Sequence, residues 1–238
     1  MFHEKGPTFL ELVRQALSST DRGYDLLAPK FEYTPFRTPD QILKTVAAAL
    51  EESAPIESAL DLGCGTGAAM RMLGPLCRDR VVGIDFSQGM LGVGRESIIQ
   101  TSGKANLFFV RADALQIPFV AQFDLAVCFG AVGHFRRPDQ PRLIAQIAQS
   151  LKPGGRFVTV TSNLPSVWSR GYWIAVTFNG VMHLRNLVIR PPFVMYYLQF
   201  LLPEARELLE SGGFQVEVRE GLFEGRYAHL KLVLATLE

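Results

Sequence analysis

Short apolar runs alternate with amphipathic stretches across residues 56–162, and this alternation is the strongest pattern in the chain. The apolar runs have the length of buried strands, and the stretches between several of them repeat apolar side chains at helical spacing. Strands that alternate with helices predict βαβ units, and therefore a parallel sheet with helices on both faces. The predicted strands are residues 58–62, 80–85, 106–113, 123–129 and 155–162, and the predicted helices are residues 68–77, 87–100 and 138–152.

The chain before this pattern is expected to be mostly helical. Residues 8–17 and 39–53 are amphipathic, and Pro39 and Asp40 fit the start of a helix. Between them, residues 24–39 are rich in aromatic side chains and prolines, which predicts an irregular segment.

The chain after the pattern changes character twice. Residues 163–203 are apolar and aromatic, and we expect a helical insertion there. Residues 204–214 predict a helix that stops at the two glycines 212 and 213. Residues 214–221 and 226–238 then predict two strands, which brings the expected sheet to seven strands.

These patterns predict an α/β fold: a doubly wound, mostly parallel seven-stranded sheet with a C-terminal antiparallel strand, an N-terminal helical cap and a helical insertion after the fifth strand. The predicted segments are a cap or lid at 1–55, a cofactor-binding core at 56–162, an apolar acceptor lid at 163–203, and a closing helix with two strands at 204–238.

Composition narrows the class of protein. The net charge of +1 gives no basic footprint for nucleic acid, and the mean hydropathy of +0.15 reflects an apolar excess that lies mainly in residues 163–203. The three cysteines lack metal-binding spacing, so we expect reduced thiols and no metal site. Charged residues near the N-terminus argue against a secretory signal, which predicts a cytoplasmic protein.

The most informative chemistry lies in residues 59–70, read as ALDLGCGTGAAM, where a glycine loop joins a strand to a helix. Glycines let the backbone approach a ligand closely, and the helix start offers free N–H groups. Asp61 precedes the first glycine and suits an amine-bearing ligand. Asp85 follows 18 residues after Gly67, at the distance from which an acid typically binds ribose hydroxyls. A ligand with both an ammonium group and a ribose is S-adenosylmethionine.

Five segments, in order and correctly spaced, resemble the motifs of class I S-adenosylmethionine-dependent methyltransferases of the small-molecule type, close to the groups called methyltransferase domains 11 and 25. The segments are ALDLGCGTG, VVGIDFSQGML, VRADALQIPF, FDLAVCFGAVGHF and LKPGGRFVTV. This resemblance implies a Rossmann-like core, S-adenosylmethionine as cofactor and S-adenosylhomocysteine as product.

The resemblance also implies roles for individual residues. Asp61 and the glycine loop would surround the methionine part, Asp85 would bind the ribose, and Asp113 would bind the adenine amine. The full set of expected cofactor-binding residues is Asp61, Gly63, Cys64, Gly65, Gly67, Asp85, Phe86, Met90, Asp113, Ala114, Phe129 and Gly130.

The acceptor side is less clearly encoded. His134 is a candidate general base, with packing beside the cofactor as the alternative. Aromatic and polar-tipped residues suit a lipophilic acceptor pocket. The expected substrate residues are Tyr33, Arg37, Tyr172, Trp173, His183, Tyr196 and Tyr197. The apolar stretch of the insertion is too short to span a bilayer. Its apolar surface could instead contact a membrane or a second copy of the chain.

The expected function is therefore methyl transfer to a small, lipophilic or aromatic acceptor by in-line displacement, catalysed mainly by positioning. Two alternatives stay open at this point. An NAD(P)-dependent oxidoreductase fits the formal match of GCGTGA to G-x-G-x-x-A, although Asp61 would repel a pyrophosphate. A non-catalytic binding module with the same fold is the second alternative.

Overall fold

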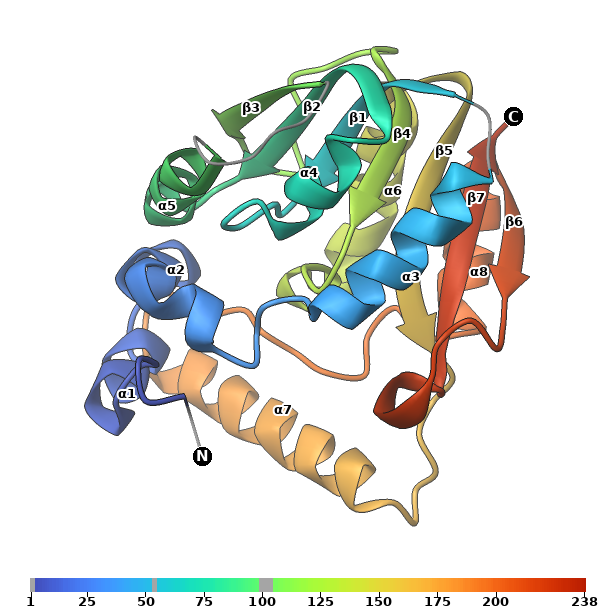
Figure 1. Cartoon of the computed structure of the whole chain (residues 1–238). Helices are drawn as coiled ribbons and strands as arrows, with labels where there is room; N and C mark the ends of the chain where they lie inside the picture. Colours follow the sequence, from blue (N-terminus) through green and yellow to red (C-terminus); the bar gives the residue numbers. More distant parts are fainter. Residues whose placement is uncertain (1–2, 53–54, 99–104) are drawn as a thin grey trace.

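The computed structural model describes residues 3–52, 55–98 and 105–238, and its centre is one seven-stranded sheet (Figure 1). The strand order is β3-β2-β1-β4-β5-β7-β6. The first five strands pair in parallel, and β7 runs antiparallel to both β5 and β6. The predicted sheet is thereby confirmed. The strands are β1 Ile56–Leu62, β2 Cys77–Asp85, β3 Asn106–Arg111, β4 Phe123–Cys128, β5 Leu151–Ser162, β6 Phe214–Arg219 and β7 Leu230–Leu237.

Helices cover both faces of this sheet. Buried side chains of α3 (Asp40–Glu51), α4 (Ala68–Leu73) and α5 (Gln88–Ile98) join one apolar cluster, and those of α6 (Gln140–Ser150) and α8 (Glu204–Ser211) join the other. The doubly wound arrangement follows from this placement. The last residues of two predicted helices, Ser53 and residues 99–100, lie outside the described residues.

Two element boundaries differ from the prediction. The predicted helix 68–77 ends at Leu73, and β2 already begins at Cys77. Gly74 still has helical backbone angles, but Pro75 has no N–H to donate the next helical hydrogen bond. β5 begins at Leu151 rather than at residue 155. The lysine-proline-glycine-glycine segment is therefore part of the strand, with Gly154 at a positive φ of 73°.

The N-terminal segment contains more helix than predicted. α1 spans Phe9–Ala16 as expected, but residues 24–39 are not simply irregular. They include the end of α2 (Thr20–Leu27) and a 3₁₀ helix, η1 (Ala28–Tyr33). The side chain of Ser19 accepts a hydrogen bond from the Arg22 N–H and so starts α2. This cap was the sequence signal for the missed helix.

The insertion after β5 forms one helix and a returning segment. α7 spans Arg170–Val188 and lies far from the sheet, next to α1 and α2 (Figure 1). The returning segment then hydrogen-bonds to two distant parts of the chain: the Val194 N–H donates to the Thr20 hydroxyl at 2.8 Å, and the Tyr196 N–H donates to the Gly133 carbonyl at 2.8 Å. Among the described residues, no helix is both long and apolar enough to cross a membrane.

Candidate functional site

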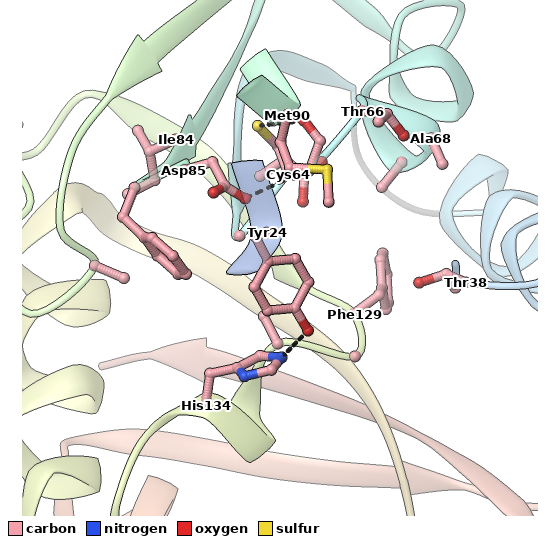
Figure 2. A pocket seen from close by; sticks show the side chains of 18 of the residues that line it. Tyr24, Thr38, Cys64, Thr66, Ala68, Ile84, Asp85, Met90, Phe129 and His134 are labelled. Carbon is pink, nitrogen blue, oxygen red and sulfur yellow. Dashed lines mark hydrogen bonds between the residues drawn. The ribbon is translucent and has the colours of Figure 1, made fainter. Parts of the chain in front are cut away.

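One pocket at the carboxyl ends of the central strands collects most of the predicted site residues (Figure 2). Parallel pairing aligns β1, β2 and β4, with Asp61 beside Gly83 and Val127, so the residues that follow these strands meet at one edge of the sheet. The predicted residues that line the pocket are Arg37, Asp61, Gly63, Cys64, Gly65, Asp85, Phe86, Met90, Asp113, Ala114, Phe129, Gly130 and His134.

The glycine loop is shaped by two glycines with different roles. Gly63 has φ of 67° and lines the pocket, and a Cβ there would lie 2.5 Å from the Ala131 side chain. Gly67 has φ of 81°, is the N-cap of α4, and faces Phe109 rather than the pocket. Gly67 therefore sets the turn into the helix, whereas Gly63 leaves room beside the pocket.

Asp85 lies at the end of β2 and fixes the loop opposite it. Its Oδ2 accepts from the Gly65 N–H at 2.9 Å, and its Oδ1 accepts from the Ser87 N–H at 2.8 Å. Each carboxylate oxygen has a further acceptor site. Burial raises the pKa of this carboxyl, against the effect of the two backbone donors. The side chain can thus hold the loop and still accept hydrogen bonds from the hydroxyl groups of a ligand.

Asp61 is the clearest sign that a cation belongs in the pocket. Its side chain is 2% exposed, and among the described residues its Oδ2 has no hydrogen-bond partner. Burial and the nearby charge of Asp85 raise its pKa well above the usual value. A buried carboxylate without a partner is costly, and a cationic group placed against it removes that cost. The unpartnered carboxylate oxygen therefore fits a ligand with an ammonium group.

The adenine side of the predicted site is also assembled. Asp113 and Ala114 line the pocket two and three residues beyond the end of β3, and the Asp113 Oδ1 accepts from the Leu115 N–H at 2.8 Å. Met90 is fully buried, where it packs against Leu27 and Ala28 of the N-terminal segment. The cofactor end of the pocket is therefore bounded by both the core and the segment above it.

Two acidic residues of the N-terminal segment attach it to the pocket rim, and sequence analysis did not identify them. Asp25 Oδ1 accepts from the Ser87 hydroxyl at 2.6 Å and from the Gly89 N–H at 2.8 Å. Glu32 accepts from the Thr66 hydroxyl and pairs with the Arg37 guanidinium at 2.7 Å. No local sequence signal marks these long-range contacts.

A tyrosine–histidine pair lies at the opposite end of the pocket (Figure 2). Tyr24 Oη and His134 Nε2 are 2.8 Å apart, and His134 Nδ1 lies 2.8 Å from the Val194 carbonyl oxygen. A carbonyl can only accept, so Nδ1 carries the proton and Nε2 accepts from the tyrosine hydroxyl. Burial lowers the pKa of His134 and raises that of Tyr24, which keeps both groups neutral.

The other predicted substrate residues do not converge on this pocket. Tyr172, His183, Tyr196 and Tyr197 border a second hollow between α7 and the segment 197–199. Tyr33 stacks on His3 with ring centres 4.9 Å apart. Trp173 is 59% exposed, and its indole N–H donates to the Val167 carbonyl. Of the expected substrate set, only Arg37 lines the main pocket.

Comparison with known proteins supports the chemistry of the pocket. A family model described as "Methyltransferase domain" matches residues 59–155. Demethylmenaquinone methyltransferase of Staphylococcus aureus is 32% identical over 187 residues, which cover 73% of this chain and 74% of that protein. The chain belongs to the S-adenosylmethionine-dependent methyltransferase family.

Solved structures show the same fold. Magnesium protoporphyrin IX methyltransferase of Synechocystis PCC 6803, with bound S-adenosylhomocysteine, has a TM-score of 0.60 at 18% identity and 83% coverage of both chains. Phosphoethanolamine N-methyltransferase 2 of Haemonchus contortus, in complex with S-adenosylmethionine, has a TM-score of 0.63 at 17% identity, covering 92% of this chain and 57% of that one.

The protein is therefore a small-molecule methyltransferase that uses S-adenosylmethionine and has a Rossmann-like core. These findings give no support to an oxidoreductase or a non-catalytic binding module. Asp61 gives a physical reason for the first exclusion, since its unpartnered carboxylate fits an ammonium group and would repel a pyrophosphate.

Proposed function

We propose that this methyltransferase acts on a small lipophilic or aromatic acceptor. The observation that carries the proposal is the aromatic lining of the pocket. Its aromatic side chains are Tyr24, Phe31, Phe36, Phe86, Phe129 and Phe135. Arg37 is the one Lys or Arg side chain among the described lining residues, and Glu32 and Asp40 already neutralise it at 2.7 and 2.6 Å. An anionic acceptor would lack a free partner there.

The cofactor end is proposed to work through three acids. Asp61 would pair with the ammonium group, Asp85 would accept from the ribose hydroxyls, and Asp113 would accept from the adenine amine. Support comes from the unpartnered Asp61 oxygen and from the remaining acceptor sites of the Asp85 carboxylate. The glycine loop with Cys64, Phe86, Met90, Ala114, Phe129 and Gly130 would complete the contacts.

S-adenosylmethionine supplies an activated methyl group and leaves as S-adenosylhomocysteine, so the chain has to align the acceptor in line with that methyl and exclude water. The N-terminal segment, held on the pocket rim by Asp25 and Glu32, would act as the lid. Segments 1–55 and 163–203 are thus proposed as covers over the core 56–162 and 204–238.

His134 is proposed to act on the acceptor through Tyr24. The acceptor proton would pass to Tyr24 Oη as the tyrosine proton passes to His134 Nε2, which leaves a histidinium whose Nδ1–H stays bonded to the Val194 carbonyl. The neutral tautomer and the lowered pKa of His134 support this role, since Nε2 is free of a proton at neutral pH.

The similarity to demethylmenaquinone methyltransferase favours a quinone-like acceptor within the lipophilic class. We further propose a cytoplasmic protein, in line with its three free, buried cysteines, and contact of residues 163–203 with a membrane or a second copy of the chain.

The test is transfer from methyl-labelled S-adenosylmethionine to two acceptors of opposite character. Reduced demethylmenaquinone represents the lipophilic class, and phosphoethanolamine, named for a structural relative, represents the anionic polar class. We expect label in the organic extract of the quinol reaction and none in phosphoethanolamine, read by mass spectrometry. Label in phosphoethanolamine alone would overturn the proposed acceptor class and leave the cofactor assignment standing.

A further inference from the structure

The outward side of α7 is apolar, which is unusual for a helix at the surface of a protein. Six large apolar side chains of α7 are exposed, and helical geometry places them with Arg170 and Thr177 on one arc of about 140°. They are Trp173, Ile174, Val181, Leu184, Leu187 and Val188. The inward side, with Ala175 and Met182, is buried against the protein.

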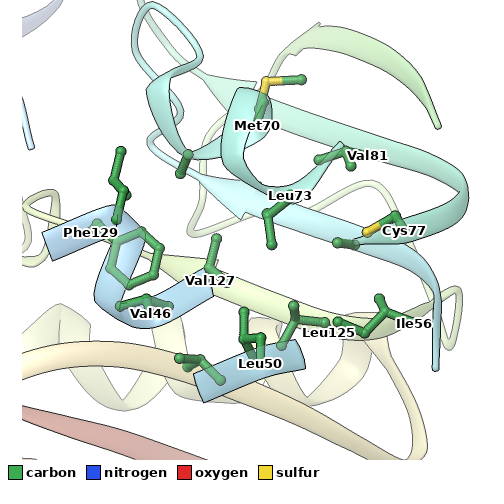
Figure 3. Close-up of a cluster of buried hydrophobic side chains, with 14 of the residues drawn as sticks. Val46, Leu50, Ile56, Met70, Leu73, Cys77, Val81, Leu125, Val127 and Phe129 are labelled. Carbon is green, nitrogen blue, oxygen red and sulfur yellow. The ribbon is translucent and has the colours of Figure 1, made fainter. Parts of the chain in front are cut away.

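A comparison with α3 shows how far this departs from ordinary packing. Val46 and Leu50 of α3 are buried in the cluster drawn in Figure 3, and Gln41 and Lys44 face outward. α7 has apolar residues on both sides. The rest of the protein buries those on the inner side, whereas those on the outer side are exposed to solvent. A helix that is apolar all round is normally covered on all sides.

α1 continues the same kind of surface. Phe9, Leu10, Val13 and Leu17 are all exposed and fall within an arc of about 100°, while polar Gln15 is buried. The two helices are held together at their ends, because the Arg185 side chain donates to the Ala16 carbonyl at 2.9 Å and to the Ser18 carbonyl at 2.6 Å. We use the term docking face for the exposed apolar side chains of α1 and α7 together with Val167 and Trp168, which is 93% exposed.

Charge around the α7 part of the docking face has one sign. The chain contains 23 acidic residues, but none lies between Gln140 and Pro203. Arg170 begins α7, Arg190 follows its end and Arg14 borders the apolar arc of α1; all three are exposed. Within the described ranges, none of these three side chains has an ion-pair or hydrogen-bond partner. An apolar surface with exposed tryptophan and a cationic border matches an anionic bilayer surface.

A second copy of the chain fits this face less well. Two docking faces brought together would oppose arginines to arginines, with no carboxylate from residues 140–203 to neutralise them. Anionic lipid headgroups supply the missing charge, and acyl chains cover the apolar side chains. Charge complementarity therefore selects the lipid surface.

We propose that the docking face of α1 and α7 binds the surface of an anionic lipid bilayer. The proposal rests on the proposed lipophilic acceptor, because a lipid surface is the natural source of such an acceptor and the face lies close to the pocket. Met182 of α7 packs against Phe193 and Tyr196, and Phe193 in turn stacks on Tyr24 with ring centres 6.3 Å apart. One packed layer of side chains thus separates α7 from the tyrosine–histidine pair.

The experiment is vesicle flotation of the full chain in the absence of any acceptor. Vesicles contain phosphatidylcholine with an equal part of phosphatidylglycerol, and phosphatidylcholine alone serves as the neutral comparison. We expect the wild type to float with the anionic vesicles, and raised salt to weaken this binding. Failure of the wild type to bind anionic vesicles would overturn the proposal.

Val181→Glu is compared with Val120→Glu, because the two valines are exposed to nearly the same extent, 59% and 61%, and only Val181 belongs to the docking face. We expect Val181→Glu to lower vesicle binding at least about tenfold and Val120→Glu to leave it unchanged. Equal losses in both variants would contradict the proposal, as would a wild-type dimer that Val181→Glu dissociates, measured by light scattering.

The arginines are tested by Arg170→Gln with Arg190→Gln, against Arg78→Gln with Arg226→Gln as a charge-matched control elsewhere on the surface. Loss of each docking-face arginine is expected to weaken anionic-vesicle binding about fivefold. An equal loss of anionic-vesicle binding in the control pair would show that the attraction depends only on overall charge, and would overturn the proposed docking face. Because no acceptor is present, these results are independent of the acceptor assay, and S-adenosylhomocysteine affinity is expected to be unchanged in all four variants.

Discussion

The two ends of the candidate pocket are built in different ways. The cofactor end consists of residues at or just beyond the carboxyl ends of β1, β2 and β3, so its acids are placed by the register of a rigid parallel sheet. The acceptor end joins segments that are far apart in the chain, and its tyrosine–histidine pair connects positions 110 residues apart. Cofactor binding at the first end is thus determined by the core. Catalysis at the second end depends on how segments 1–55 and 163–203 pack over the core.

The largest expected effect falls on the cofactor end. Asp85→Ala removes the proposed ribose acceptor and the partner of the Gly65 and Ser87 N–H groups. We expect a loss of about 3 kcal/mol in S-adenosylhomocysteine binding, which is roughly 150-fold, because hydrogen bonds to charged groups are involved. Calorimetric titration measures this. Asp79→Ala, an exposed acid on the same strand, serves as the control and is expected to bind normally. Equal affinities of the two variants would contradict the ribose assignment.

The next effect belongs to the acceptor end. Tyr24→Phe and His134→Ala each break the proposed proton path and are expected to lower turnover about 100-fold, with little change in cofactor affinity. Because the pKa of His134 is lowered from 6.5, wild-type turnover should stay constant as the pH falls from neutral to below this value, and should decrease only when Nε2 becomes protonated. A loss of turnover centred above pH 6.5 would exclude His134 as the base.

Asp61→Asn tests whether the buried charge at the cofactor end favours cofactor binding and at the same time destabilises the ligand-free protein. Removal of the charge should weaken S-adenosylmethionine binding about tenfold and stabilise the ligand-free protein. The pKa of Asp61 is raised above 3.8, so the folded state binds its proton more tightly than the unfolded chain. The contribution of protonated Asp61 to the free energy of unfolding is present at low pH and is lost as the pH rises through the pKa of Asp61 in the folded state.

The stability difference between Asp61→Asn and wild type should therefore grow from roughly pH 4 to pH 7 and shrink when S-adenosylhomocysteine is bound. Thermal unfolding at several pH values measures both trends. A variant that is less stable than the wild type at neutral pH, without ligand, would refute the buried unpartnered carboxylate.

The smallest effect concerns the packing of the returning segment of the insertion against Gly133. A Cβ at Gly133 would lie 2.6 Å from the Tyr196 carbonyl oxygen, so Gly133→Ala should push the returning segment away and cost about 1 kcal/mol of unfolding free energy. Gly92→Ala has open space in α5 and should be neutral or stabilising. Turnover should fall in Gly133→Ala alone, and normal turnover there would show that the insertion is not coupled to the acceptor end.

The contrast between the two ends also explains what the sequence could predict. The positions of Asp61, Asp85 and Asp113 followed from their place after apolar runs, because the carboxyl ends of parallel strands meet at one edge. The pairing of Tyr24 with His134, and the contacts of Asp25, could not be predicted, since each depends on the path of a segment that has no regular pairing with the sheet.

The insertion was predicted in type but not in orientation. Its helix was expected, yet apolar residues on all sides of α7 left no periodic signal to show which side faces inward. Tyr172 borders the second hollow, whereas its neighbour Trp173, about 100° further round the helix, is exposed. The residue pattern alone does not show which of the two faces the hollow.

The most direct test of separable ends combines Asp85→Ala, Tyr24→Phe and the double variant in one series. The S-adenosylhomocysteine dissociation constant and the single-turnover rate at saturating S-adenosylmethionine are measured for each. We predict that Asp85→Ala changes the dissociation constant, that Tyr24→Phe changes the rate, and that the double variant shows both effects at full size. A Tyr24→Phe variant that binds S-adenosylhomocysteine as weakly as Asp85→Ala, with an unchanged single-turnover rate, would contradict the account.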